Sequence, residues 1–225
     1  GACDWSSDVC SSDLFGALCL ASITTQVVHA QAPANLPFET DFESAEGYTL
    51  GPLRTDAHWQ FSSSLAAEIL TPGAASNQAL GFSGGAGLWL STDSQGVQVS
   101  WVDFYTKPVF VEHFELPEII ETEQSAVTGF VKVDAQGKVY AIDGDGLGGG
   151  IWSPSGFRTN LAADGESAFD WIRLTYRIDY FSKSWDLFVD GQLSLADLGF
   201  LDDSRYTLDA FAIFSDADSA TQLDY

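Results

Sequence analysis

The segment Trp171–Tyr180 (WIRLTYRIDY) alternates between two kinds of side chain. Even positions carry Ile, Leu, Tyr, Ile and Tyr, whereas the odd positions after Trp171 carry Arg, Thr, Arg and Asp. A period of two, with β-branched and aromatic residues on one side, is typical of a β-strand that buries one face. This pattern excludes a helix here and predicts a strand at the edge of a hydrophobic core.

The residues that follow predict how this strand is paired. Trp185–Val189 alternates again, and Asp190-Gly191 comes directly after it. Asp-Gly readily adopts the two positive φ angles of a type I′ hairpin turn. Because Gln192–Leu195 then begins a return strand, we predict an antiparallel meander.

Strand signals separated by turn residues recur along the chain, and only Leu195–Leu201 (LADLGFL) hints at a helical turn. This pattern predicts one all-β domain, a sandwich or barrel, rather than a parallel α/β sheet. The other predicted strands are Phe38–Glu43, Trp59–Phe61, Glu68–Leu70, Ala79–Ser83, Gly87–Ser91, Val97–Tyr105, Ala126–Asp134, Lys138–Asp143, Leu208–Ser215 and Gln222–Tyr225.

The first thirty residues require a separate interpretation. Residues Asp4–Leu14 (DWSSDVCSSDL) match the translation of a common sequencing adapter, so we set residues 1–14 aside as not native. Residues 15–30 then form an apolar stretch of signal-peptide length that ends in Val28-His29-Ala30, a small-residue cleavage pattern. We interpret them as the remnant of a signal peptide, with a buried strand as the alternative. The chain is therefore expected to be secreted, to the extracellular space or cell surface.

The expected mature domain, residues 31–225, is strongly acidic and has no cysteine. The full chain has 32 acidic and 9 basic residues, net charge −23, and all three cysteines precede residue 20. Removing Asp4, Asp8 and Asp13 with the leader leaves 29 acids against 9 bases, net −20. Such a balance argues against binding nucleic acid or an anionic membrane, both of which need basic surfaces. No later apolar run reaches the length of about 18 residues that a membrane helix needs.

Several segments resemble a known family. FETDFESAEGYTLGPL (Phe38–Leu53) and FDWIRLTYRIDYFSKSWDLFVDGQLSLADLGFLDD (Phe169–Asp203) are similar to concanavalin A-like, laminin-G-like jelly-roll domains of secreted bacterial proteins. Val102–Phe110 and Tyr140–Trp152 resemble further segments of that family. The resemblance implies an antiparallel jelly-roll β-sandwich. Since family members end in a strand that begins "LDD" or "LDY", the stop at Leu223-Asp224-Tyr225 suggests a truncated C-terminus.

The resemblance implies a function as well as a fold. Domains of this type bind glycans or other extracellular surfaces without catalysis, or serve as structural modules of larger exported proteins. We therefore expect a polysaccharide or glycoconjugate partner and no enzymatic activity.

One segment offers an enzymatic alternative. Glu39, Asp41 and Glu43 resemble the E-x-D-x-E signature of laminarinase-type glycoside hydrolases, which share the jelly-roll fold. On a strand the three carboxylates would share one face, as a nucleophile, a bridging Asp and an acid/base require. Against this, Thr40 stands where those enzymes have an aliphatic residue. The alternative interpretation is an edge strand with an acidic solvent face.

Two glycine-rich segments match functional patterns. Gly81-Phe82-Ser83-Gly84-Gly85 fits the G-x-S-x-G nucleophile elbow, but a strand rather than a helix is expected next, which favours a glycine-rich hairpin. In DGDGLGGG, Asp143 and Asp145 offer hard oxygen ligands on a tight turn, as Ca²⁺ prefers. The spacing does not fit an EF-hand, so a β-turn and a calcium site both remain open.

Exposed aromatic side chains are the usual stacking surface for sugar rings. The mature domain has six tryptophans: Trp59, Trp89, Trp101, Trp152, Trp171 and Trp185. Trp171 and Trp185 lie in the strand motifs and are expected in the core. Trp152 follows the glycine-rich segment directly, so we predict that Trp152 is exposed and binds the ligand.

Overall fold

The computed structural model describes residues 33–53, 59–61, 67–71, 73–74, 76–83, 87–94, 96–110, 119–121, 128–134, 136–160, 170–214 and 219–224. Residues Ala32–Tyr225 form one compact unit. The predictions for residues 1–14 and 15–30 lie outside the described part. No helix among the described residues is long and apolar enough to cross a membrane.

The predicted meander is present. Strands β12 (Ile172–Asp179), β13 (Ser184–Val189) and β14 (Gln192–Gly199) pair antiparallel in that order. Asp190 and Gly191 have φ angles of 50° and 75°, which confirms the predicted two-residue turn with both central residues left-handed. The helical turn predicted at Leu195–Leu201 is wrong, because β14 continues to Gly199. A bulge opposite Asp186, with Asp197 at φ 56°, breaks the period of two there.

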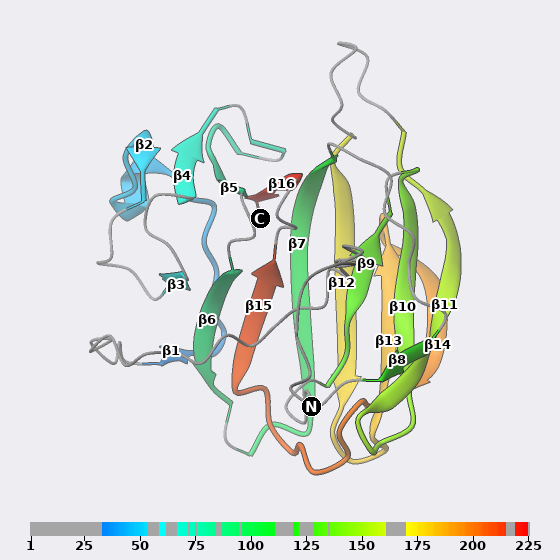
Figure 1. Cartoon of the computed structure of the whole chain (residues 1–225). Coiled ribbons are helices and arrows are strands. Elements are labelled where there is room, and N and C mark those ends of the chain that lie inside the picture. Colours follow the sequence, from blue (N-terminus) through cyan, green and yellow to red (C-terminus); the bar gives the residue numbers. More distant parts are fainter. Residues whose placement is uncertain are drawn as a thin grey trace, which may run out of the picture. The chain divides into compact units, whose positions relative to one another are not determined.

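These strands belong to an eight-stranded sheet with the order β14-β13-β12-β7-β16-β5-β4-β2 (Figure 1). The added strands are β7 (Val99–Phe110), β16 (Ser219–Asp224), β5 (Ala79–Ser83), β4 (Ala67–Leu70) and β2 (Gly51–Pro52). All neighbouring pairs in this sheet are antiparallel. Strand β16 pairs on both sides, so the last described residues occupy the middle of the sheet.

Two smaller sheets contain the other strands. One has the order β8-β11-β10-β9, built from β8 (Ile119–Glu121), β11 (Gly149–Arg158), β10 (Lys138–Gly144) and β9 (Val131–Val133). The other contains β1 (Ala34–Asn35), β6 (Gly87–Asp93), β15 (Ala210–Phe214) and β3 (Trp59–Phe61). Only the short β1–β6 pair is parallel among the described pairs. A 3-10 turn, η1, spans Ser44–Glu46.

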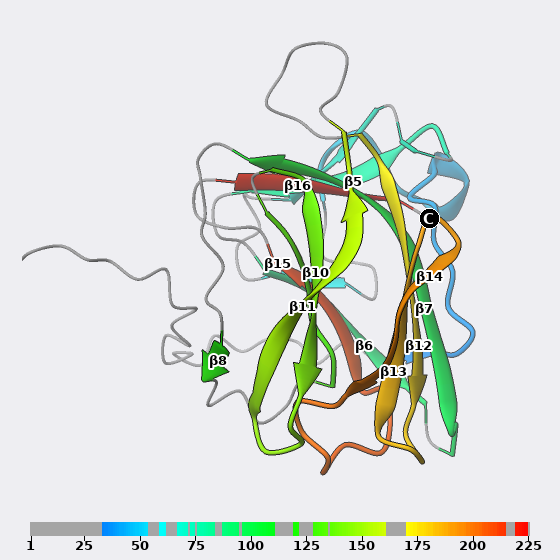
Figure 2. The same ribbon diagram turned by 90° about the vertical axis from the view of Figure 1, so that its right-hand side faces the viewer.

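The layers face one another as in a β-sandwich. Figure 2 shows β10 and β11 opposite β7, β12, β13 and β14. Between the layers lie the even-numbered side chains of β12 and the odd-numbered ones of β13, among them Leu174, Trp185 and Leu187, which are at most 3% exposed. Phe104 of β7 and Phe211 of β15 bring their ring centroids to 5.0 Å across the layers. The chain is therefore an all-β antiparallel sandwich, as the alternation predicted.

The strand predicted at Phe38–Glu43 is wrong. These residues form no strand, and Phe42 has a left-handed φ of 58°. Thr40 Oγ1 accepts a hydrogen bond from the backbone N–H of Phe42 (3.3 Å), and Asp41 Oδ1 accepts one from that of Glu43 (3.2 Å). Such side-chain turns compete with the strand ladder for backbone groups. Phe42 itself is buried, with its ring 5.4 Å from Tyr48 and 5.9 Å from Trp59.

The G-x-S-x-G segment connects two sheets. Strand β5 ends at Ser83 and the next described element is strand β6, which begins at Gly87, so a strand follows as expected. The two strands do not pair with each other: β5 pairs with β4 and β16, and β6 with β1, β3 and β15. The predicted hairpin is therefore wrong, and the segment is a crossover between layers.

Candidate functional site

The solvent side of β7, β12 and β13 carries a patterned face. Alternation buries Phe104 and Leu174 and leaves the odd-numbered residues of β7 and β12 on the opposite side. Across the β7–β12 ladder, Trp101 lies opposite Arg177, Asp103 opposite Thr175, and Tyr105 opposite Arg173. Residues directly opposite each other in an antiparallel pair point to the same face.

An apolar strip crosses this face. It consists of Trp101 on β7, Phe188 on β13 and Leu193 on β14. Trp101 is 58% exposed and Leu193 56% exposed. The rings of Trp101 and Phe188 lie 5.8 Å apart at 40°, and Leu193 is the direct partner of Phe188.

Thr175 explains how two aromatic rings on non-adjacent strands meet. It lies on β12 between them, opposite Phe188 on one side and Asp103 on the other. A short side chain at this position leaves the space above β12 open, so Trp101 and Phe188 approach each other across it. The strip therefore forms a continuous apolar surface across the strands.

Two arginine–carboxylate groups border the strip. In the first, Arg173 Nε donates to Asp103 Oδ1 (3.0 Å) and its Nη2 pairs with Asp103 Oδ2. Thr175 Oγ1 donates to Asp103 Oδ1 (2.7 Å). Burial raises the pKa of the Asp103 carboxyl, but the hydrogen bonds from Arg173 and Thr175 outweigh burial and leave that pKa below its ordinary value. The carboxylate is therefore ionised in any neutral medium.

The second group surrounds Arg177. Its Nη1 donates to Asp186 Oδ2 (3.2 Å), and its Nη2 lies 3.6 Å from Asp179 Oδ2. Asp186 Oδ1 also accepts the backbone N–H of Asp197 (2.9 Å), so this carboxylate fastens the β14 bulge. We call Asp103, Arg173, Thr175, Arg177, Asp179 and Asp186 the polar border, and strip and border together the platform.

The structure does not bring the predicted catalytic acids onto one strand face. Glu39 is exposed, and Asp41 caps a local turn through Glu43 N. Glu43 Oε1 accepts hydrogen bonds from the backbone N–H groups of Asn77 (2.5 Å) and Gln78 (3.1 Å). Glu43 therefore fastens a loop, and the geometry expected of a strand-borne E-x-D-x-E motif is not found.

The predicted calcium ligands are hydrogen-bonded to backbone. Asp145 Oδ1 accepts from Leu147 N (2.8 Å) and Gly149 N (3.0 Å), and Asp143 Oδ1 accepts from Gly199 N (2.8 Å). Within the described part of the chain, no group of three or more His, Cys, Asp or Glu residues could hold a metal ion. Asp145 therefore shapes the β10–β11 hairpin, and Asp143 links β10 to the end of β14.

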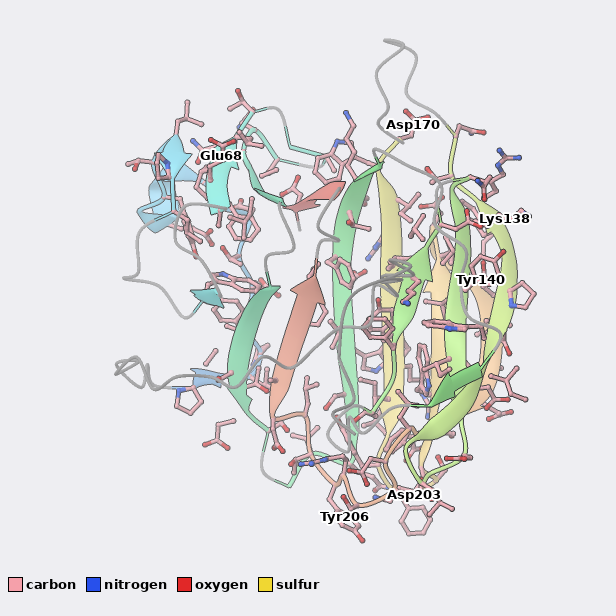
Figure 3. The ribbon with its side chains drawn as sticks, in the orientation of Figure 1. Glu68, Lys138, Tyr140, Asp170, Asp203 and Tyr206 are labelled. Atoms are coloured by element: carbon pink, nitrogen blue, oxygen red, sulfur yellow. The ribbon has the colours of Figure 1, made fainter. Side chains whose placement is uncertain are left out.

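The glycines of the same segment allow close backbone packing. Gly146 N donates to Phe200 O (2.8 Å), and Asp203 N donates to Gly146 O (3.1 Å). A side chain at Gly144 would overlap the backbone of Phe200. Figure 3 shows Asp203 and Tyr206 at this end of the strands, opposite the end with Lys138 and Asp170. The DGDGLGGG segment thus packs against the part of the chain that follows β14 and is hydrogen-bonded to it.

Trp152 is buried, contrary to the prediction. It is 8% exposed, its ring lies 5.9 Å from that of Phe130, and Lys132 Nζ is 4.9 Å from its ring centre. The glycine run belongs to β11, whose alternation points Ile151 outward (64% exposed) and Trp152 inward. The turn predicted in DGDGLGGG is present at residues 145–148, but β11 already begins at Gly149, so Trp152 lies within a strand and its face was assigned wrongly. Trp185, 1% exposed, lies in the core as predicted, and Trp171 is half-buried.

Trp101 is an exposed tryptophan that was not singled out from the sequence. The signal was available, because alternation in Val97–Tyr105 places Trp101, Asp103 and Tyr105 on one face. What the pattern lacked was the pairing of β7 with β12 and of β12 with β13. Without it, Phe188 and the two arginines could not be placed beside Trp101.

Comparison with known proteins gives limited guidance. No family model matches the chain, and no curated protein is significantly similar to it. Among solved structures, it is similar to domain 4 of AbnA, a GH43 extracellular arabinanase from Geobacillus stearothermophilus, in complex with arabinotriose. That match has 10% identity and a TM-score of 0.37, and it covers 78% of this chain and 81% of the other. At this level of similarity, the function has to be inferred from the chain's own residues.

Proposed function

We propose that this chain is a secreted, non-catalytic glycan-binding module of the concanavalin A-like, laminin-G-like type, and that the platform is its binding face. The observation that carries the proposal is the contact of exposed Trp101 with half-buried Phe188, bordered on the same face by hydrogen-bonding side chains. Large exposed apolar groups that adjoin one another usually mark a site of interaction.

The chemistry of the platform matches that of a sugar ring. A sugar presents C–H groups on its faces and hydroxyls around its edge. The faces can stack on Trp101 and Phe188, and the edge hydroxyls can donate to Asp103 or Asp186 and accept from the arginines. Because these side chains stand on three paired strands and contact one another, little ordering is required on binding.

A folded protein is a less suitable partner for this surface. Standard protein interfaces involve about 20–30 residues a side, with a hydrophobic centre depleted of charge. The strip has three apolar side chains, and charged groups lie directly beside it. A narrow chain of sugars fits such a strip better than a broad protein surface does.

The central test is substitution of the strip. Trp101→Ala is expected to weaken binding to a recognised polysaccharide at least tenfold, because one stacking surface is lost, while the melting temperature changes little. The measurement is affinity electrophoresis against a panel of soluble polysaccharides, followed by calorimetry. Leu147→Ala is the matched control, since Leu147 is 92% exposed on the β10–β11 hairpin, outside the platform.

Two results would contradict the proposal: binding to no polysaccharide of the panel, or binding that Trp101→Ala leaves unchanged. The non-catalytic part has its own check, a reducing-end release assay on β-glucans. Turnover that is lost in Glu43→Gln would show a glycoside hydrolase instead. Export is checked by sequencing the N-terminus of secreted protein, which should begin at Gln31.

A further inference from the structure

Each arginine of the platform is already paired with protein carboxylates. Arg173 uses two nitrogens, Nε and Nη2, on the two oxygens of Asp103. Arg177 lies between Asp186 and Asp179, at 3.2 and 3.6 Å. A bidentate arginine–carboxylate pair is among the stronger side-chain interactions on a protein surface. An anionic ligand could pair with either guanidinium only beside a carboxylate that already neutralises its charge.

The net charge of the platform also disfavours an anionic ligand. The polar border has two arginines and three aspartates, so its formal charge is −1. The whole chain carries −23. A carboxylate or sulfate group arriving on a sugar therefore meets net repulsion, strongest at low ionic strength. Hydroxyl groups, in contrast, can use the free lone pairs of the same carboxylates at no electrostatic cost.

We propose that the platform selects uncharged polysaccharides and rejects chains that carry uronate or sulfate groups, with Asp103, Asp179 and Asp186 as the residues that enforce the selection. This inference rests on the proposed function, because it concerns the ligand of the same site. In this proposal the two arginines hold the carboxylates in place and orient sugar hydroxyls, and they do not serve to bind anions.

The test compares polysaccharides with the same sugar backbone and linkage, for example a β-1,4-glucan with its C6-oxidised glucuronan, and a galactan with the same galactan after chemical sulfation. The neutral member of a pair is expected to bind at least tenfold more tightly at low salt. The difference should shrink at high salt, because screening shortens the range of the repulsion. An acidic member that binds as tightly as its neutral partner, in a Trp101-dependent manner, would overturn this inference and leave glycan binding intact.

A charge-removing variant sharpens the test. Asp103→Asn keeps the size of the side chain but frees Arg173 from its carboxylate, so binding of the acidic chain is expected to increase several-fold. Asp203→Asn, an exposed acid on the loop after β14, removes the same charge elsewhere. An equal gain in Asp203→Asn would show an effect of overall charge and contradict a role for the platform. If no glycan of either kind binds, the inference and the proposed function both fail.

Discussion

Gly144 shows how a single residue controls the junction between layers. Its Cα faces the backbone carbonyl of Phe200, and Gly199 faces the carbonyl of Gly144 in turn. The two segments approach so closely that neither position has room for a Cβ. The requirement arises from contact between β10 and the end of β14, which are more than fifty residues apart in the chain.

Gly144→Ala is expected to destabilise the domain by about 2–3 kcal/mol, because backbone has to move to admit the methyl group. Chemical denaturation would measure this as a lower midpoint. Gly156→Ala is the control: its position on β11 is open, and only its φ of 76° is unfavourable, at about 1 kcal/mol. Equal losses for the two variants would argue against close packing at Gly144.

Asp103 gives a prediction about pH. Its pKa in the folded state lies below the ordinary value of 3.8, so its ion pair contributes stability above that pH and loses it as the pH falls through the lowered pKa. Since Asp103 and Arg173 are partly exposed, the contribution is about 1 kcal/mol or less. Asp103→Asn should therefore melt slightly below the unmodified protein at neutral pH.

The difference between the two proteins should shrink between about pH 7 and about pH 2, because the pH falls toward the lowered pKa of Asp103 and the folded state loses its charged carboxylate. Thermal unfolding followed by circular dichroism at both pH values is the measurement. A difference that stays constant from neutral to acid pH would mean that charge at Asp103 is not what stabilises the pair.

At the scale of elements, the strip depends on three neighbouring ladders. Strands β7, β12, β13 and β14 are separated by three inter-strand spacings, so the strip is about 14 Å long. It runs obliquely across the strands: Phe188 and Leu193 are direct partners, whereas Trp101 lies two residues along β7 from Asp103, which shares the register of Phe188 through Thr175. A ligand that follows the strip therefore crosses the strands.

Affinity is therefore expected to depend on the length of the oligosaccharide. It should rise with each added sugar until the chain spans the strip, and then level off, because further sugars extend past Leu193 or Trp101. Calorimetry with a series of oligosaccharides of one linkage is the measurement. Saturation with a single sugar would indicate a pocket for a chain end and contradict binding along the strip.

At the scale of the whole molecule, the dominant feature is the excess of negative charge. With 32 acidic residues against 9 basic ones, ion pairs can neutralise only a minority of the carboxylates. Mutual repulsion between these carboxylates destabilises the compact folded state. Salt screens the repulsion, because the Debye length falls from about 30 Å at 0.01 M to about 8 Å at 0.15 M.

The melting temperature at neutral pH is thus expected to rise by several degrees between these two salt concentrations. Close to the sequence pI of about 4.1 the net charge is small, and the same addition of salt should have little effect. Differential scanning calorimetry at both pH values tests this. A fall in melting temperature with salt at neutral pH would show that ion pairs outweigh the general repulsion.

The sequence by itself determined the strands of the meander, the type I′ turn at Asp190-Gly191 and the all-β class. These depend on alternation and turn chemistry, which act between residues close in the chain. Local patterns were misleading at Phe38–Glu43, where side-chain turns replaced the ladder, and at Trp152, where a glycine run concealed a strand.

Only the tertiary structure decided which strands are neighbours. Trp101 and Phe188 are 87 positions apart in the chain, and they meet only because β12 pairs with both of their strands. The same pairing places Arg173 on Asp103. Strands β5 and β6, although consecutive in the chain, lie in different sheets because each pairs with other strands. Strand partners are chosen by packing between distant segments, and a local period carries no information about such contacts.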